Sequence, residues 1–473
     1  MSTETAPGVQ AALDHLEANA DAHRDQLDEL LEIPSVSADP ARDHEVRHAA
    51  QWIASQLAGI GFEHIALQET SGHPIVTADW LHAGMGRPTI LVYCHYDVQP
   101  DDPLDEWVRP PFEPRHEGGR VYARGAGDDK GQLFIHLKAA EAWMKTAGRL
   151  PINLRIFFEG DEEVGSLPVE TFIAEHPELL AADLCVVSDT GMQDDEGTPA
   201  ITYGLRGIAY FEVKVSGPFQ DLHSGGYGGG VANPANVLVK LLAGLQDADG
   251  RVTIPGFYDR VWPLTDAERA SYSRIPFDAE SYREAIGVPL LWDGEAGYTL
   301  LERLSARPTL DIHGLWGGYS GVGAKTIIPS WAATKFSTRL VPDQDYAEIE
   351  RMVVEHLERA APPTVRIEVR VIHGGAPAIT PIDHPAISVA ARALEEAFGK
   401  APVFLRGGGS IPVVAALEKG IGLKTVLIGF ASPNGNFHAP NEWMPAQNLQ
   451  RGMQAIVRLW GAFGEMTPQQ LRS

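Results

Sequence analysis

The sequence predicts an α/β domain with a largely parallel central sheet, interrupted by an inserted α+β domain. Strand-like and helix-like segments alternate up to about Gly204, the alternation then stops, and it resumes after about residue 384. We therefore expect the α/β domain to occupy residues 1–204 and 384–473, and the insert to occupy residues 205–383.

Apolar, β-branched runs predict four strands in the first part, and helical spacing of apolar residues predicts two helices. The expected strands are Ile75–Trp80, Pro88–Tyr93, Ile152–Phe158 and Leu184–Val187, and the expected helices are Glu45–Ala58 and Gly131–Met144. Ligands of parallel sheets gather beyond the carboxyl ends of the strands, so the loops that follow these strands are where a site is expected.

The insert begins with a long amphipathic strand over residues 204–217 and contains an irregular stretch at 250–308. Its other expected elements are a helix at Asn233–Leu245, strands at Lys325–Ile328, Ala332–Leu340 and Val365–Ile372, and a helix at Tyr346–Ala360. In the last part, helices Ala386–Phe398, Pro412–Leu417 and Gln447–Phe463 alternate with strands Val403–Leu405 and Thr425–Ile428.

Composition excludes several classes of protein. The 63 acidic residues outnumber the 38 basic ones, and the net charge of −25 disfavours nucleic acid and anionic membrane surfaces as partners. The two cysteines, Cys94 and Cys185, lie in apolar runs, so no disulfide framework is expected. The acidic N-terminus does not resemble a signal peptide, and no apolar run approaches the roughly 18 residues of a membrane span. We expect a cytoplasmic protein.

His95 and Asp97 follow a buried-looking strand in VYCHYDVQP. Residues two apart in a strand point to the same side, so Asp97 could hold the second ring nitrogen of a metal-binding His95. Taken alone, such a pair is more often an ordinary strand-edge histidine beside a solvated aspartate.

Acidic residues follow two further strands. Asp128 lies in RGAGDDKGQ, where two acids could simply favour a helix N-terminus, and Glu162 and Glu163 lie in EGDEEVGS among four carboxylates. Closely packed carboxylates repel one another, which raises their pKa values unless a cation compensates.

Asp189 in VVSDTG and His438 in GNFHAPNE could each be a turn or capping residue. Together with His95, Asp128 and Glu163, however, they place two histidines and three carboxylates at the strand ends of one sheet. That set of ligands predicts a site for two metal ions.

Two other patterns point elsewhere. His44 and His48 match H-E-x-x-H, the zinc-protease pattern, but the apolar residues of that helix predict that both histidines lie on its polar face. Ser410, in GGGSIP, fits a tight turn better than a nucleophile.

Seven motifs together resemble the M20 family of metallopeptidases, and its carnosinase-like dipeptidase branch in particular. They are CHYDVQP, GAGDDKGQ, EGDEEVGS, VSDTG, DLHSG, STRLVP and NFHAPNE, and the similarity covers nearly the whole chain. The resemblance implies a catalytic α/β domain, an inserted lid domain through which two subunits form a homodimer, and two divalent metal ions per chain, zinc or manganese.

The resemblance also implies a role for individual residues. Asp128 would bridge the two metals, His95 and Asp189 would complete one site, and Glu163 and His438 the other. Asp97 would orient His95, Glu162 would be the general base, and the Asp128–Asp129 peptide bond would be cis. His223 would stabilise the oxyanion in a neighbouring subunit's site, Arg339 would bind the substrate's terminal carboxylate, and His373 and Ser410 would contact substrate.

These roles predict a hydrolase that cleaves dipeptides or short peptides with a free C-terminus, through a water activated between the metals. An N-acyl-amino-acid deacylase or other amidohydrolase of the same family would use the same ligands with a different pocket. A non-catalytic homologue is a third alternative, disfavoured because all five ligands and Glu162 are present.

Overall fold

The computed structural model describes residues 7–409 and 411–472, and it divides into two compact units. The first unit comprises Met1–Tyr203, Thr380–Leu405 and Pro412–Ser473, and the second comprises Gly204–Ile379 and Arg406–Ile411. The change of texture near Gly204 therefore falls where the second unit begins. The short segment Arg406–Ile411 returns to that second unit, which the sequence did not indicate.

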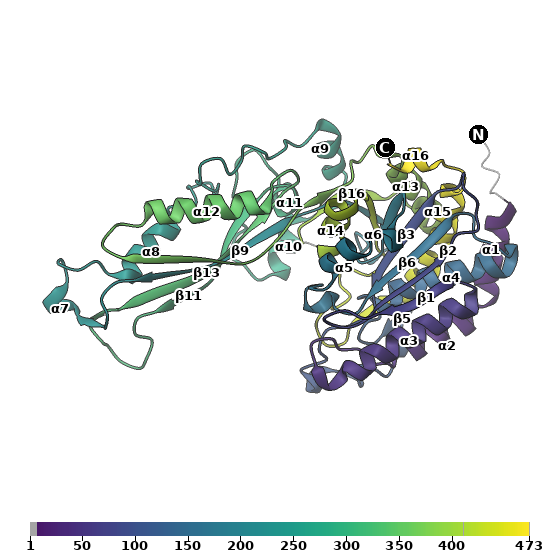
Figure 1. Cartoon of the computed structure of the whole chain (residues 1–473), viewed down its shortest axis with the longest axis horizontal. Helices are drawn as coiled ribbons and strands as arrows, with labels where there is room; N and C mark the ends of the chain where they lie inside the picture. The colour runs from purple at the N-terminus through teal and green to yellow at the C-terminus, as the bar shows by residue number, and fades with distance from the viewer. Residues whose placement is uncertain (1–6, 410, 473) are drawn as a thin grey trace. The chain divides into compact units, whose positions relative to one another are not determined.

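A nine-stranded sheet, whose strands lie wholly or mostly in the first unit except for Ala378–Ile379, forms the centre of that unit (Figure 1). Its path is β1-β2-β6-β3-β7-β17-β8-β15, with β16 beside β8. The strands are β1 (Glu63–Gln68), β2 (Ile75–Trp80), β3 (Thr89–His95), β6 (Asn153–Glu159), β7 (Leu184–Val187), β8 (Ala200–Leu205), β15 (Ala378–Ile379), β16 (Val403–Gly407) and β17 (Thr425–Ile428). The α/β class is as predicted. The parallel order holds for the four central strands, β6, β3, β7 and β17, whereas β1 and β2 on one side and β8 and β15 on the other pair antiparallel.

Helices cover both faces of this sheet, as a buried parallel sheet requires. Ile90, Val92 and Cys94 of β3 join the main apolar core on one face, while Leu91 and Tyr93 point to the other face. Helices α3 (Asp43–Ile60), α4 (Lys130–Ala147), α13 (Pro385–Phe398) and α15 (Ala446–Phe463) supply the core on the first face. Helices α5 (Val169–Glu175), α6 (Pro177–Leu180) and α14 (Pro412–Ile421) lie on the second face (Figure 1).

The rest of the first unit packs around these layers. It comprises helices α1 (Pro7–Ala18), α2 (Ala20–Leu31) and α16 (Pro468–Arg472), and a small sheet of β4 (Arg115–Glu117), β5 (Arg120–Tyr122) and β18 (Trp443–Pro445). Helix α1 packs against α4 and α15, and α2 packs against α4. The thiols of Cys94 and Cys185 are both free and buried. Within the described residues, no helix has the length and apolar character needed to cross a bilayer.

An antiparallel sheet in the order β11-β13-β9-β14 forms the second unit. Its strands are β9 (Gly207–Ser216), β11 (Thr309–Gly317), β13 (Trp331–Leu340) and β14 (Arg366–Gly375), and helices α8 (Pro234–Ala243) and α12 (Tyr346–Ala360) cover one face. A two-stranded sheet of β10 (Leu222–His223) and β12 (Ile327–Ile328) and the helices α7 (Ser224–Tyr227), α9 (Asp266–Tyr272), α10 (Ala279–Ala285) and α11 (Leu300–Ser305) complete the unit. Strand β11 was not predicted, and α9 to α11 lie inside the stretch that was expected to be irregular.

Candidate metal centre

The five predicted metal ligands converge at one edge of the first unit's sheet. His95 ends β3, Glu163 follows β6, Asp189 follows β7, and His438 lies in the loop between β17 and β18. Asp128 comes from the loop between β5 and α4. The carboxyl ends of β6, β3, β7 and β17 lie side by side because these four strands are parallel neighbours, and this brings together residues far apart in the sequence.

The side chains form two groups that share Asp128. His95, Asp128 and Asp189 form one group and Asp128, Glu163 and His438 the other, with the potential ligand atoms of each group within 4.8 Å of one another. Nε2 of His95 lies 3.0 Å from Oδ1 of Asp128, and Nε2 of His438 lies 3.0 Å from Oδ2. The two carboxylate oxygens of Asp128 therefore face different groups, as a bridging carboxylate must.

Asp97 lies on the side of the His95 ring away from Asp128. Nδ1 of His95 is 3.3 Å from Oδ1 of Asp97 and 3.1 Å from its backbone oxygen, and both side chains are fully buried. Asp97 also accepts hydrogen bonds from the Ser37 hydroxyl and from the backbone N–H groups of Glu162 and Glu163. It thus links the His95 ring to the loop that carries both glutamates.

Glu442, which the sequence analysis did not single out, holds the Asp128 loop. Its carboxylate accepts hydrogen bonds from the backbone N–H groups of Gly125, Gly127 and Asp128, and from the Arg124 guanidinium. The only sequence signal was its place at the end of the NFHAPNE motif. The Asp128–Asp129 peptide bond is cis, as the resemblance predicted.

The carboxyl pKa values of the site show that it gathers several buried negative charges. Burial raises the pKa of Glu163 to about 8, with Asp128 adding to the shift. Burial likewise raises the pKa of Glu162, and it raises that of Asp189 well above its ordinary value. Asp128 differs, because hydrogen bonds to His438 and His95 outweigh its burial and hold its pKa well below the usual range.

This donor set fits two divalent cations. Imidazole nitrogens and carboxylate oxygens are ligands of Zn²⁺ and Mn²⁺, and a cation would relieve the repulsion that raises the carboxyl pKa values. Within the described residues, the buried Oε1 of Glu163 has no hydrogen-bond partner, while Gln99 donates to its Oε2 at 2.6 Å. The backbone of His438 is in the left-handed region at φ +61°, a conformation that non-glycine residues adopt mainly where the surrounding structure enforces it.

His44 and His48 take no part in this centre. They lie on α3 with side chains 75% and 60% exposed, on the polar face that the helical spacing predicted. Glu45 between them contacts both rings at 3.3–3.4 Å.

Arg339 and His373, two of the predicted substrate residues, lie in the second unit, as does His223. Arg339 is on β13 and His373 on β14, the two strands that flank β9, and burial, with a smaller contribution from the Arg339 charge, lowers the pKa of His373. Tyr210 of β9 stacks on the rings of His373 and His313 at 5.2 and 5.1 Å, an arrangement that the sequence analysis missed. His223 ends β10 and is exposed, with its Nδ1 accepting from the N–H of Gly226. Ser410 lies outside the described residues.

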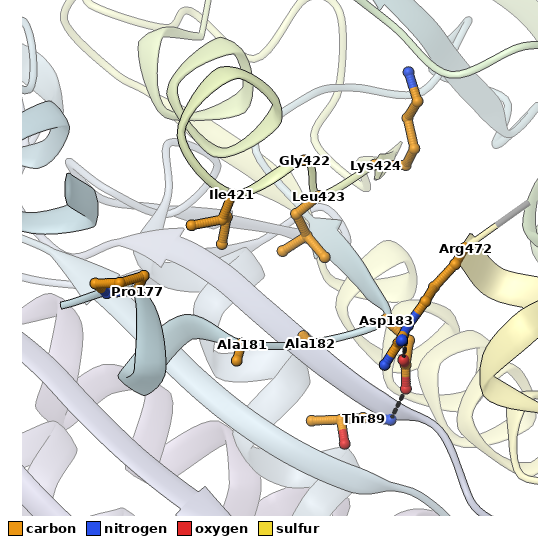
Figure 2. Close-up of a pocket in the computed structure, with 10 residues that line it drawn as sticks. All are labelled: Thr89, Pro177, Ala181, Ala182, Asp183, Ile421, Gly422, Leu423, Lys424 and Arg472. Atoms are coloured by element: carbon orange, nitrogen blue, oxygen red, sulfur yellow. Dashed lines mark hydrogen bonds and ion pairs between the residues drawn. The ribbon is translucent and has the colours of Figure 1, made fainter.

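A cavity of about 550 Å³ lies at the opposite edge of the first unit's sheet (Figure 2). Its lining includes Thr89, at the start of β3, and Asp183 and Lys424, directly before β7 and β17. Figure 2 shows Arg472 pointing toward Asp183, whose carboxylate accepts from Arg472 Nε and from the Thr89 N–H. These are the amino ends of the strands, so this cavity is separate from the metal centre.

Comparison with known proteins relates the whole chain to peptidases. A model of the peptidase family M20/M25/M40 matches residues 91–462. A Cys-Gly metallodipeptidase of Candida albicans is 33% identical over 95% of this chain and 96% of its own length. The human Beta-Ala-His dipeptidase is 34% identical over 82% of this chain and 76% of its own length. The solved structure of an M20 family metallo-carboxypeptidase from Sulfolobus solfataricus has a TM-score of 0.82 and 30% identity, covering 94% of this chain and 99% of that chain.

Proposed function

Because this chain belongs to the peptidase family M20/M25/M40, we propose that it hydrolyses dipeptides or short peptides that carry a free C-terminus. The observation that carries the proposal is the pair of three-residue groups sharing Asp128, at the strand ends where α/β sheets hold their ligands. Its relatives named Cys-Gly metallodipeptidase and Beta-Ala-His dipeptidase support a dipeptide as the substrate.

We assign Asp128 as the ligand shared by two divalent cations, zinc or manganese. His95 and Asp189 complete one site, and Glu163 and His438 the other. Asp97 orients His95 through its contact with Nδ1, which leaves Nε2 directed at the metal position. When bound, the pair of cations supplies a nucleophilic water at neutral pH and polarises the scissile carbonyl.

Glu162 is assigned as the general base. It is adjacent to Glu163 and close enough to His95 and Asp128 for both to affect its pKa, which burial raises from its ordinary value. A carboxylate with a raised pKa accepts a proton more readily, and the resulting acid can return that proton to the leaving amine. This base-then-acid exchange completes cleavage of a peptide bond.

Residues of the second unit are assigned to substrate recognition. Arg339 would bind the terminal carboxylate by two parallel hydrogen bonds, with His373 and Ser410 as further contacts. His223 would stabilise the oxyanion in the site of a neighbouring subunit. The edge strand β11 exposes Ile312, Leu315 and Trp316, and exposed apolar edge strands are prone to pair, which supports a homodimer formed through this unit.

The substitution Glu162→Gln tests the mechanism. We expect hydrolysis to fall about 10²–10⁴-fold, the usual contribution of a general base, while two metals per chain remain bound. The exposed His44→Gln is the matched control and should keep full activity. Near-normal turnover by Glu162→Gln would show that the role is misassigned, and loss of activity in His44→Gln would favour a zinc endopeptidase on α3.

A deacylase of the same family is the second candidate, since the same metal centre would serve it. Dipeptides, N-acyl amino acids and N-succinyl compounds assayed with zinc-, manganese- and cobalt-loaded protein would separate the two. The proposal requires dipeptides to be cleaved with the highest kcat/KM. A higher kcat/KM for N-acyl amino acids would instead identify the protein as a deacylase.

A further inference from the structure

A second cluster of potential metal ligands lies among the N-terminal helices, away from the strand ends. His15 of α1, His23 of α2 and Glu141 of α4 place one potential ligand atom each within 4.8 Å of one another. The rings of His15 and His23 have centroids 6.3 Å apart and are tilted by 50°. Three helices thus contribute one donor each to a common point.

Both histidines present a nitrogen that no hydrogen bond uses. His23 is 4% exposed, and its Nδ1 has no partner among the described residues. Nε2 of His15 is also buried without a partner there, while Nδ1 of His15 lies 3.4 Å from the Asn19 amide. Leaving a buried polar atom unpaired costs about 1–3 kcal/mol, so two such atoms in one cluster of potential ligands indicate that something binds them.

Glu141 is held in place by Lys138. Nζ of Lys138 lies 2.7 Å from Oε2 of Glu141 and 2.5 Å from the side-chain oxygen of Gln26, with Gln56 at 3.5 Å. The ion pair holds the carboxylate through its Oε2. It also balances the positive charge of Lys138 beside the cluster.

We propose that His15, His23 and Glu141 bind a single Zn²⁺ ion, separate from the two-metal centre. Two imidazole nitrogens and one carboxylate oxygen are a standard zinc donor set, and water supplies the fourth ligand. Zinc bonds of about 2.0–2.1 Å separate tetrahedral ligands by roughly 3.3–3.4 Å, which small side-chain rotations of this cluster provide. The ion fastens the N-terminal helices α1 and α2 to α4.

The charge state of His23 agrees with this role. Burial, together with Lys138, lowers its pKa to about 4, so the ring is neutral at pH 7 and can donate a lone pair to a metal. Helix α4 begins directly after the Asp128–Asp129 bond, so the same helix connects the zinc site to the two-metal centre.

Zinc content provides the test. The whole chain is stripped with a chelator, dialysed against Zn²⁺, desalted and analysed for zinc per chain. The proposal predicts three zinc ions in the unaltered protein and two in each of His15→Gln, His23→Gln and Glu141→Gln, with dipeptide hydrolysis retained. The exposed His48→Gln is the matched control and should keep three.

A second background separates this site from the two-metal centre. In a chain carrying both Asp128→Asn and His438→Ala, Zn²⁺ should still raise the thermal unfolding midpoint, and adding His15→Gln or His23→Gln should abolish that rise. Equal zinc content in the unaltered protein and in all three cluster variants, or an unchanged rise in the midpoint after His15→Gln and His23→Gln, would overturn the proposal. Since hydrolysis and zinc content are read separately, failure of the proposed peptidase activity would leave this result standing.

Discussion

Glu442 and Arg124, more than three hundred residues apart, form an ion pair inside the first unit. Nη1 of Arg124 lies 2.8 Å from Oε2 of Glu442, and the two side chains are 1% and 0% exposed. Because Glu442 also accepts three backbone N–H groups of the Asp128 loop, this pair fixes the residue that both metal groups share. The loop after β17 therefore contributes two residues to the candidate metal centre: His438, a potential ligand, and Glu442, which holds the Asp128 loop.

The substitution Glu442→Gln should destabilise the protein and weaken metal binding. It removes the carboxylate that balances the buried Arg124 charge and turns an amide toward backbone donors. Breaking a buried pair costs about 3–5 kcal/mol, and loss of such supporting contacts lowers metal affinity about 10–100-fold. Denaturant unfolding and metal titration measure both effects. Glu69→Gln, which breaks the exposed pair with Arg47, is the control and should leave both quantities nearly unchanged.

Asp97→Asn should weaken metal binding without unfolding the protein. An asparagine amide is neutral, so it lacks the negative charge with which Asp97 would make His95 a better ligand. We therefore expect metal affinity to fall about 10–100-fold. Competition with a chromogenic chelator measures it. The exposed pair His64 and Asp79 supplies the control, Asp79→Asn, which should bind metal as the unaltered protein does. Equal affinity for Asp97→Asn would contradict the orienting role.

Metal-free protein should lose stability as pH rises from about 5 to 8. The folded-state pKa of Glu163 is about 8 against 4.5 for the free side chain, so the native state holds an extra proton in this range and unfolding becomes easier as pH rises.

His95 and His438 act in the same direction on this slope. Hydrogen bonds with Asp128 raise the pKa of His438, and they raise that of His95 despite its burial. The stability these charged rings contribute is present below pH 6.5 and is lost as pH rises through their folded pKa values. Denaturant midpoints measured with a chelator should fall as pH rises. With Zn²⁺ present, the midpoint should depend less on pH. Equal slopes would contradict a cation at this site.

Arg339→Lys should raise KM for dipeptides about tenfold with a smaller change in kcat. A lysine keeps the charge but loses one of two charge-assisted hydrogen bonds to the terminal carboxylate. Steady-state kinetics measure the split. Arg370→Lys, at an exposed position on strand β14 of the same sheet, is the control and should not alter KM. A fall in kcat alone would remove Arg339 from substrate binding.

Short sequence patterns predicted the strands and the potential metal ligands at their ends, because both depend on residues that are close together in the sequence. The apolar runs of β3 and β7 gave strands whose ends carry His95 and Asp189, and the parallel order of the central strands then made convergence a geometric consequence. Glu442 could not be predicted in this way, because its role comes from contacts with Arg124 and the Asp128 loop that no short segment contains. Strand β11 was missed because a bulge between Ile312 and Gly314 interrupts its alternation.

The burial of both cysteines determines how the protein responds to thiol and disulfide reagents. Cys94 and Cys185 are the only thiols in the chain, both are 0% exposed, and burial raises the pKa of each well above that of a free thiol. Disulfide exchange needs an accessible thiolate. A small-molecule disulfide in solution would therefore find no accessible thiolate on this protein with which to form a mixed disulfide.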